Sequence, residues 1–209
     1  MEACQALRYR VFYEELGAIA DVAARVSRRD ADRFDAICDH LMVVSTVPTQ
    51  RANPIAISGG ELVGTYRLLR QELAERQGGF YTAGEYGIAP VLAGHPGLRF
   101  LELGRSCVLA PYRTRPVVEL LWQGIWNFVR LHKLDVMFGC ASFEGTDPDV
   151  HALPLTFLAR NRLAPPEWRV RARPELFVAM DRIAGAIDAK AAIRALPPLI
   201  KGYLRLGCY

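Results

Sequence analysis

The sequence lacks the features that mark several common classes of protein. It has no apolar run long enough to cross a membrane. Charge appears within its first residues, so no signal peptide is expected. The five cysteines are scattered without a Cys-x-x-Cys pair, and the four histidines have no metal-ligand spacing. Neither a disulfide framework nor a metal site is therefore expected, and a reducing cytoplasm is the simplest location.

The composition is that of a globular domain with a mildly basic charge. Hydrophobic residues make up 51% of the 209 positions and charged residues 23%, which suffices for a core within a single domain. The net charge of +4 is well short of a nucleic-acid-binding domain, so no nucleic acid partner is expected. It suits an acidic protein, a phosphate-bearing substrate or a peripheral contact with the anionic inner face of the cytoplasmic membrane.

Hydrophobic periodicity predicts an alternation of helices and strands. Helices are expected over residues 3–16, 117–131 and 151–162, and again from about residue 186, where Pro197 and Pro198 interrupt the tail. Strands are expected over residues 40–47, 61–69, 101–109, 135–143, 168–173 and 176–180. Residues 21–39, 49–60 and 78–99 are expected to be loops or short irregular segments.

The order of these elements defines the fold class. Strand 101–109, helix 117–131 and strand 135–143 form a βαβ unit, whereas strands 40–47 and 61–69 are expected to be antiparallel. The polar residues of helix 117–131 fall on one narrow stripe, which predicts a helix buried on most sides against a sheet. We therefore expect an α+β fold: a mixed, largely antiparallel sheet flanked by helices on both faces.

Two charges interrupt the apolar strand LELGRSCVL, at Glu102 and Arg105. Charges inside a buried strand are costly unless they are paired or used in chemistry. One interpretation is a structural salt bridge to residues 21–39 or to Arg67, and the other is an active site; the residues alone do not decide between them. Residues three apart share a face of a strand only across a bulge, which we predict at Gly104.

Other polar groups are weaker candidates. Arg8 and Phe12 lie on one helical face, and Asp32 and Asp35 are close enough to bind a cationic amino acid together, although such a pair usually means only a polar loop. Arg113 and Arg115 stand before a helix start, where an anion binds well, or in a solvent-exposed turn. Arg169 and Arg171 alternate with Arg173 on an expected strand, so their side chains project from one face. With Lys201 and Arg205 they could form a basic patch that binds an acidic carrier protein or anionic lipid. The alternative is an ordinary solvated strand face.

No covalent nucleophile is evident. Cys107 and Cys140 lie in apolar strands, where a thiol is more often a buried hydrophobe, and His40 has no visible acid partner. Direct attack by an acceptor is then the simpler mechanism for any group transfer.

Several motifs resemble known enzymes. The succession LRYRVF, DRFD, LVGTYRLL and LELGRSCV is similar to the acyl-homoserine-lactone synthases, which use acyl carrier protein and have the GNAT-type N-acyltransferase fold. A closer resemblance, over nearly the whole chain, is to the L-ornithine N-alpha-acyltransferase family, carried by LRYRVFYEE, GTYRLLR, LELGRSCV, FGCASFEGTDP and LPPLIKGYLRLG. That family makes lyso-ornithine lipid from a 3-hydroxyacyl-acyl carrier protein, the first step of bacterial ornithine lipid biosynthesis.

The resemblance implies roles for the matching residues. Glu102 is expected to take a proton from the α-amine of L-ornithine, while Arg105 orients Glu102 or holds the acceptor's carboxylate. The remaining residues are expected to bind substrate: Arg8, Phe12, Asp32, Asp35, Arg67, Ser106, Cys107 and Val108. Backbone amides near residues 106–108 are expected to polarise the thioester carbonyl. YRTRPV replaces the glycine-rich loop of coenzyme A-dependent GNAT enzymes, which suits the single phosphate of phosphopantetheine, near Arg113 and Arg115.

Activity and partners follow from the same resemblance. The co-substrate is expected to be acyl carrier protein carrying a 4'-phosphopantetheine thioester, contacted also by Arg169 and Arg171, with no bound cofactor or metal. The alternatives are signal synthesis from S-adenosylmethionine and a non-catalytic domain that binds acyl carrier protein. Residues 1–209 are expected to form one GNAT-like domain that lacks the family's N-terminal strand and C-terminal extension.

Overall fold

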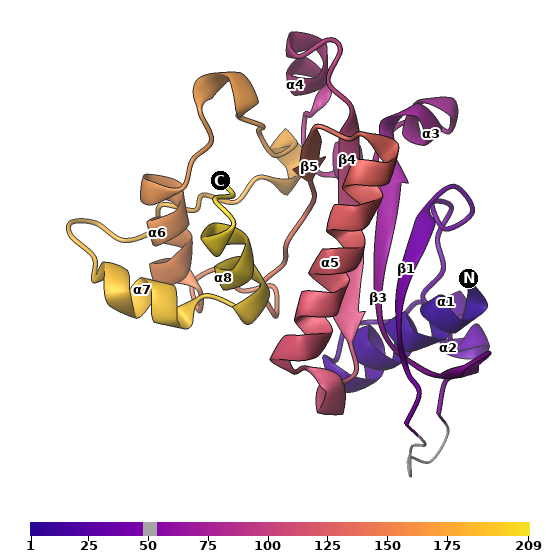
Figure 1. Ribbon diagram of the computed structural model, residues 1–209. Helices are drawn as coiled ribbons and strands as arrows, with labels where there is room; N and C mark the ends of the chain where they lie inside the picture. Colours follow the sequence, from indigo (N-terminus) through magenta and orange to yellow (C-terminus); the bar gives the residue numbers. More distant parts are fainter. Residues whose placement is uncertain (48–53) are drawn as a thin grey trace. The chain divides into compact units, whose positions relative to one another are not determined.

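The computed structural model describes residues 1–47 and 54–209 and forms two compact units. The first part of the predicted loop 49–60, up to residue 53, lies outside the described residues. The first unit comprises Met1–Tyr81 and Gly97–Cys140, and the second comprises Thr82–Pro96 and Ala141–Tyr209. Figure 1 shows the elements of both.

The first unit is built on a five-stranded mixed sheet. Its strands are β1 (Asp39–Ser45), β2 (Ala56–Ile57), β3 (Gly60–Arg70), β4 (Phe100–Val108) and β5 (Val136–Phe138). The order is β1-β3-β4-β5, with β2 also pairing with β3. All pairs are antiparallel except β4 with β5, so the predicted antiparallel pair and the βαβ unit are both confirmed.

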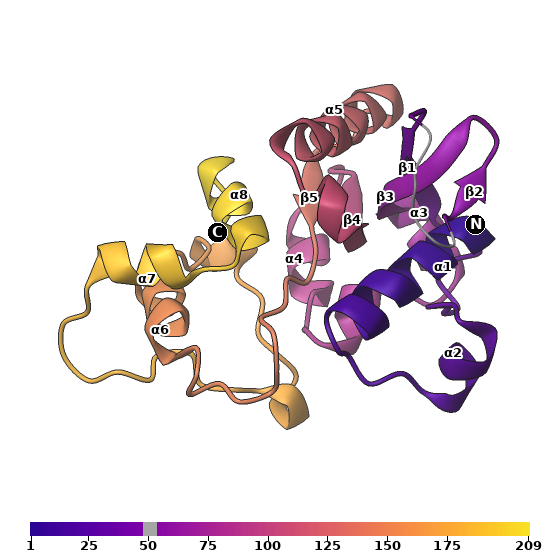
Figure 2. The same ribbon diagram turned by 90° about the horizontal axis from the view of Figure 1, so that it is seen from below.

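Helices cover both faces of this sheet, as predicted. The helical segments of the first unit are α1 (Glu2–Tyr9), the π-helix η1 (Arg10–Glu15), α2 (Val22–Ser27), α3 (Gln71–Arg76), η3 (Ala110–Tyr112) and α5 (Arg115–His132). Figures 1 and 2 show α5 on one face of the sheet and α1 on the other. Each makes its own apolar core with the sheet: Leu121 and Ile125 pack against Leu101 on the α5 side, and Leu7 packs against Leu62 on the α1 side.

Helix α5 is less buried than the sequence suggests. Only Leu121, Ile125 and Val129 are fully buried, and large side chains such as Trp126 and Leu131 are exposed. The expectation of burial on most sides is therefore wrong. A helix that covers one face of a sheet buries a single stripe, and none of the described elements of the first unit forms a further layer over α5.

The second unit is helical and has its own small core. Its helices are α4 (Ala89–Gly94), α6 (Ala152–Asn161), α7 (Ala189–Ala195) and α8 (Pro198–Arg205). It also contains the 3-10 turns η2 (Tyr81–Gly84), η4 (Pro166–Trp168) and η5 (Pro174–Leu176). The first residue of η2, Tyr81, belongs to the first unit. Phe157 of α6 packs against Ala192, Leu196 and Ile200. The predicted helix 151–162 and the helical tail broken at Pro197 are confirmed.

The strands predicted over residues 168–173 and 176–180 are wrong. Only Ala172 makes a single bridge, to Tyr86, within the described part of the chain. The backbone around this bridge pairs through two hydrogen bonds, from the N–H of Arg173 to the carbonyl oxygen of Glu85 and from the N–H of Gly87 to that of Arg171. The guanidinium groups of Arg169 and Arg173 bond the carbonyl oxygens of residues 164 and 83. An alternation of arginine with apolar residues fits an extended loop as well as a strand, and among the described residues this segment pairs with another segment only at the single bridge to Tyr86. The expected basic strand face of Arg169 and Arg171 is therefore absent, although both side chains are exposed.

Strands β4 and β5 are paired over only three residues. The pairing ends at Glu102 opposite Phe138, although β4 continues to Val108. The strand predicted over residues 135–143 is therefore much shorter. Gly139 follows β5 at a point of close backbone approach, where an added Cβ would lie 2.2 Å from the carbonyl oxygen of Leu103. This glycine therefore allows the chain to pass close to the β4 backbone at Leu103, one residue beyond the last pair.

Within the described ranges, no helix has the length and apolar character needed to cross a bilayer.

Replacement of Gly139 by alanine should lower the free energy of unfolding by about 1–3 kcal/mol, because the new methyl group meets backbone that cannot turn aside. Gly104→Ala is the matched control, since nothing lies within 4 Å of the added Cβ and the change should cost no more than about 0.5 kcal/mol. Urea unfolding measures both. Equal losses in the two variants would contradict the close approach at the end of β5.

Candidate active site

The first unit contains a buried network of arginines and aspartates. Arg8 of α1 is fully buried, and its guanidinium reaches the loop that follows α2. Its Nε lies 2.7 Å from Oδ2 of Asp30, and its Nη2 lies 2.8 Å from Oδ2 of Asp35. An unpaired guanidinium at this depth would be strongly destabilising, so the two carboxylates are what permits an arginine between α1 and the sheet.

Two arginines of the sheet extend this network. Nη1 of Arg67, on β3, lies 2.7 Å from Oδ1 of Asp32 and 3.1 Å from Oδ1 of Asp35. Arg105, on β4, is farther from its partners: its Nη2 lies 3.4 Å from Oδ2 of Asp32 and its Nε 3.5 Å from Oδ2 of Asp30. The side chains of Arg105 and Asp32 are also 29% and 23% exposed. The network therefore has a sealed end beneath α1 and a half-open end at Arg105.

The loop of residues 30–35 is shaped by its own polar groups. Oδ1 of Asp32 accepts a hydrogen bond from the backbone N–H of Phe34, and the N–H of Asp35 bonds to the carbonyl oxygen of Asp32. Such a bond from an aspartate to the chain two residues later favours a turn. Phe34 is buried with its ring centroid 5.7 Å from that of Tyr81. The turn and its aromatic anchor fix the carboxylates in place.

Asp35 is the most strongly held of these carboxylates. Burial by itself would raise its pKa, but hydrogen bonds from Arg8 and Gln5 outweigh burial and hold the pKa of Asp35 well below its usual range. The Gln5 amide contributes at 2.9 Å. Three arginines balance three aspartates across the network, so the interior carries no large net charge.

Glu102 lies on the face of β4 that points away from α5. Its neighbours Leu101 and Leu103 belong to the α5 core, so alternation along the strand directs Glu102 to the other face. The residue is only 5% exposed, and its Oε2 accepts a hydrogen bond of 2.9 Å from the backbone N–H of Tyr81. The Tyr81 ring in turn lies 5.4 Å from the guanidinium carbon of Arg105. The buried carboxylate thus adjoins the half-open end of the network.

Strand β4 carries the predicted bulge. The register against β3 shifts so that Arg105 and Ser106 together lie opposite the single residue Tyr66. The residue with a left-handed conformation is Arg105, at φ 50°, and not Gly104, where the bulge was expected. Backbone in this region is strained for a non-glycine residue and persists where surrounding contacts hold it, here the two ion pairs of the guanidinium. The bulge brings Arg105 to the same tyrosine that holds Glu102.

The structure divides the predicted substrate-binding residues into enclosed and reachable ones. Arg8 and Asp35 are enclosed and bonded to protein groups, and their expected contact with a substrate stays a prediction. Arg67 is also buried in ion pairs. Asp32 and Arg105 remain reachable. One of the two interpretations of Arg105 was a structural salt bridge to residues 21–39. Its partners in the structure, Asp30 and Asp32, lie in that segment.

The other residues expected at the substrate line the two sides of β4. Phe12 packs against the apolar core between α1 and the sheet, to which Cys107 also belongs. Burial raises the pKa of the Cys107 thiol, which keeps it protonated and unreactive. Val108 packs toward the α5 core, and Ser106 is half-buried. The backbone of all three β4 residues lies beyond the last pair with β5, the stretch predicted to meet a thioester.

The two arginines expected at a phosphate have partners of their own. Nε of Arg113 donates a hydrogen bond of 2.9 Å to the carbonyl oxygen of Val108, and its guanidinium also pairs with Glu15. Arg115 is almost fully exposed and pairs with Glu119 one turn later on α5. Arg113 therefore stands beside the β4 end, whereas Arg115 faces solvent.

Sequence reasoning missed several members of the network. Asp30 binds Arg8 and accepts a hydrogen bond of 3.1 Å from Oη of Tyr13. A count of charges would have found Asp30, because three arginines in otherwise apolar elements require three acids, and RRDADRFD supplies them. Tyr81 acts through its backbone N–H, which leaves no signal in the sequence.

The Cys4 thiol, which sequence reasoning missed, and the imidazole of His40, for which it found no acid partner, lie behind the network. Nε2 of His40 is 3.0 Å from the carbonyl oxygen of Asp35. Burial raises the pKa of the Cys4 thiol, but hydrogen bonds with His40 and Thr65, together with the nearby charges of His40 and the N-terminus, outweigh burial and lower the pKa overall. Cys4 has no exposed surface, so a bulky thioester does not reach it. This pair supports the interior and does not supply an accessible nucleophile.

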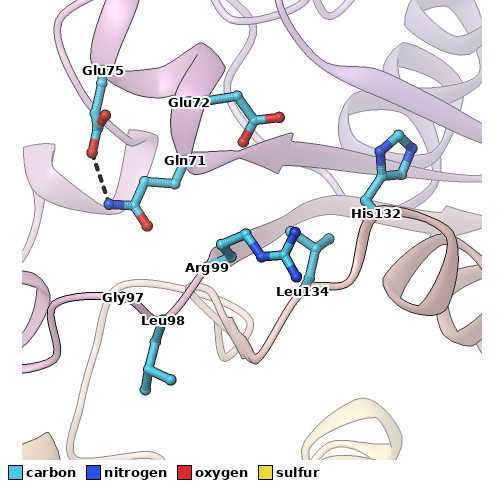
Figure 3. Close-up of a pocket in the computed structure, with 8 residues that line it drawn as sticks. All are labelled: Gln71, Glu72, Glu75, Gly97, Leu98, Arg99, His132 and Leu134. Carbon is cyan, nitrogen blue, oxygen red and sulfur yellow. Dashed lines mark hydrogen bonds between the residues drawn. The ribbon is translucent and has the colours of Figure 1, made fainter.

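A hollow of about 390 Å³ lies elsewhere in the first unit, where β3 passes into α3 and β4 begins (Figure 3). Its lining mixes acidic, basic and apolar side chains: Gln71, Glu72, Glu75, Gly97, Leu98, Arg99, His132 and Leu134. The close-up shows Gln71 bonded to Glu75 on one side of the hollow. None of the residues expected at a substrate is among its lining, so the candidate site is the Glu102 region.

Comparison with known proteins agrees with this geometry. Residues 7–123 match the family model of the acetyltransferase (GNAT) domain. The L-ornithine N(alpha)-acyltransferase of Rhizobium meliloti (strain 1021) is 54% identical over 208 residues, which cover 99% of this chain and 68% of the relative. Proteins of the same name from Brucella abortus (strain 2308) and Rhodobacter capsulatus are 52% and 41% identical, over 99% of this chain and 72% and 76% of theirs. No solved structure matches.

A mixed sheet whose bulged strand parts from its parallel neighbour is the framework of a GNAT acyltransferase, and the matched model covers more than half of the chain. The chain is therefore an enzyme of the acyltransferase class. Within that class it belongs to the L-ornithine N(alpha)-acyltransferase family, as its identity to these relatives shows. The resemblance expected from the motifs and the α+β fold are both confirmed.

Asp35→Asn should lower the free energy of unfolding by about 3–5 kcal/mol, because it removes one of the two carboxylates that pair with the buried guanidinium of Arg8 and also a partner of the buried Arg67. Asp39→Asn, which removes an exposed carboxylate 3.2 Å from Arg70, should cost less than about 1 kcal/mol. Chemical denaturation of the two variants gives the comparison. Similar small losses in both would show that the network is not a stabilising element.

Stability should also fall in acid for the same reason. The folded pKa of Asp35 is lowered, so its contribution is fully present above the ordinary aspartate value of about 4 and is lost as the pH falls through that value toward the lowered one. Urea midpoints measured from about pH 6 down to about pH 3 should decrease in the parent protein more steeply than in Asp35→Asn. Parallel slopes would mean that Asp35 titrates normally.

Proposed function

We propose that the protein transfers a 3-hydroxyacyl group from the 4'-phosphopantetheine thioester of acyl carrier protein to the α-amine of L-ornithine. The product is lyso-ornithine lipid, and the step is the first in ornithine lipid biosynthesis. The names of the relatives support the acceptor and the reaction type. The observation that carries the mechanism is Glu102, a buried carboxylate held beside the bulge of β4.

The reaction requires a base at this position. The α-amine of a free amino acid is largely protonated at neutral pH and attacks only as the neutral amine. Glu102 takes the proton, directly or through one water molecule, and its low exposure strengthens the attraction of the carboxylate for a cationic amine. The acceptor approaches Glu102 past the half-open end of the network, where Arg105 and Asp32 are partly exposed.

Arg105 and Asp32 are suited to bind the acceptor. Their mutual distance of 3.4 Å is longer than the contacts of Arg8, and the buried Nε of Arg105 has no hydrogen-bond partner among the described residues. Arg105 binds the α-carboxylate of ornithine, and Asp32 binds the side-chain ammonium. Asp35, expected to share this task, acts from behind by fixing the loop.

The acyl donor lies along the unpaired part of β4. Backbone N–H groups near Ser106, Cys107 and Val108 polarise the thioester carbonyl, since β5 ends before this stretch. Arg113, at the end of β4, and Arg115 attract the phosphate of the pantetheine arm.

The protein partner is acidic acyl carrier protein, which the exposed Arg169 and Arg171 attract through charge. The mildly basic chain also makes peripheral contact with the anionic inner surface of the cytoplasmic membrane, where the product resides.

The chemical step needs no covalent enzyme intermediate. The neutral amine nitrogen attacks the thioester carbon, a C–N bond forms, and the backbone amides stabilise the oxyanion. Collapse breaks the C–S bond and releases the pantetheine thiolate, which takes up a proton. Two protons leave the nitrogen in all: Glu102 passes the first, from the ammonium, to solvent, and then takes the second from the nitrogen once the C–N bond has formed and delivers it to the thiolate.

Glu102→Gln should reduce kcat by about 10²- to 10⁴-fold without loss of stability, because the amide keeps the shape but accepts no proton. Glu75→Gln, an exposed change in α3, is the control and should retain the parent rate. Turnover is followed as thiol release from hydroxyacyl carrier protein, and the product by mass spectrometry. Unchanged turnover in Glu102→Gln would reject the base.

The same assay separates the alternatives. A mass corresponding to acyl-ornithine supports the proposed function. A homoserine lactone formed from S-adenosylmethionine would replace it with signal synthesis. Binding of the carrier protein without thiol release, for every acceptor amine supplied, would indicate a non-catalytic domain.

A further inference from the structure

We propose that Tyr81 is a positioning residue for this reaction: its backbone N–H fixes the carboxylate of Glu102, and its ring links that carboxylate to Arg105. The inference rests on the proposed role of Glu102 as base. No sequence motif points to Tyr81; the placement of its amide and ring does.

The backbone amide of Tyr81 has a geometric reason to bind Glu102. Tyr81 is the first residue of the 3-10 turn η2, where N–H groups have no partner within the turn. Oε2 of Glu102 lies 2.9 Å from this nitrogen, across 21 positions of the chain. This hydrogen bond fixes the orientation of the carboxylate.

The preceding residues hold this amide in place. Gly78 and Gly79 adopt positive φ values of 86° and 105°, which turn the chain sharply after α3. Phe80 then enters the core, where it is 4% exposed and packs edge-to-face on Phe138 with ring centroids 4.9 Å apart. Because the side chain of Phe80, the residue before Tyr81, is anchored in the core, the N–H of Tyr81 has little freedom to move away from Glu102.

The ring of Tyr81 lies among the charged groups of the site. Its centroid is 5.4 Å from the guanidinium carbon of Arg105 and 5.9 Å from that of Arg67, within the range of cation–π attraction. It also contacts Phe34, which belongs to the loop that carries Asp32. One residue therefore touches the base through its backbone, and the acceptor-binding arginine and its loop through its side chain.

Two variants separate the amide from the ring. Tyr81→Ala removes the ring and keeps the N–H, whereas Tyr81→Pro removes both; proline is tolerated at the first position of a helical turn. Relative to Tyr81→Ala, Tyr81→Pro should lower kcat by a further factor of about 10 or more, while KM for ornithine changes by less than about twofold. A residue that only stabilises the fold would instead lower the amount of active enzyme, which thermal unfolding and active-site titration detect.

The decisive measurement repeats the pair in the Glu102→Gln background. If Tyr81 acts through Glu102, the rate ratio between the alanine and proline variants should shrink to within about twofold there. A ratio that stays near tenfold, or equal rates of the two variants with Glu102 present, would overturn the inference. Should the proline variant not fold, the rate loss caused by Tyr81→Ala is measured with Glu102 and with Gln at position 102. If the loss is the same in both backgrounds, the ring does not act through Glu102 and the inference is rejected.

Failure of the proposed function gives a different result. The parent protein would then form no acyl-ornithine, or Glu102→Gln would keep the parent rate. A parent that makes acyl-ornithine and depends on Glu102, but shows no coupling to Tyr81, would leave the proposed function intact and reject only the positioning role.

Discussion

The carboxylate of Asp35 connects the parts of the first unit that the candidate site requires. It is bound by Arg8 from α1 and by Arg67 from β3, and its own loop supplies Asp30 and Asp32. A buried ion pair of this kind is weak evidence for stability in comparison with an apolar core, but the loss of one partner is costly because the other charge stays buried. Helix, sheet and loop therefore hold a single arrangement, and the position of Asp32 beside Arg105 follows from it.

The ion pairs of Asp35 explain why the arginine–aspartate network has a structural end and an end that can bind a substrate. The Arg8 and Asp35 end is sealed, with contacts of 2.7–2.9 Å, and supports the site from behind. The Arg105 and Asp32 end has longer contacts and partial exposure, so its charges are able to exchange a protein partner for an acceptor amino acid. The bulge of β4 connects the network to the proposed base. It holds Arg105 in a strained backbone conformation and directs its side chain toward Tyr81, the residue that binds Glu102.

Much of the fold follows from local pattern, and the details of the site do not. The apolar runs of β3 and β4, the length of α5 and the βαβ order were predictable because burial imposes a period on the sequence. The bulge followed from two charges three apart in a strand, although its left-handed residue is Arg105. The absent strands at residues 168–180 show that alternation without a neighbouring strand makes no sheet. Tyr81 was not predictable because a backbone N–H is common to nearly every residue, and the division into two compact units has no marker in composition.

The most direct test of the central claim is a crystal structure of the protein with the N-acyl-ornithine product bound. The account predicts that the product's amide nitrogen lies within hydrogen-bond reach of the Glu102 carboxylate, directly or through one water, with the α-carboxylate on Arg105 and the Tyr81 amide still bonded to Oε2. A product nitrogen held by other groups, with Glu102 remaining shielded behind Tyr81, would contradict it.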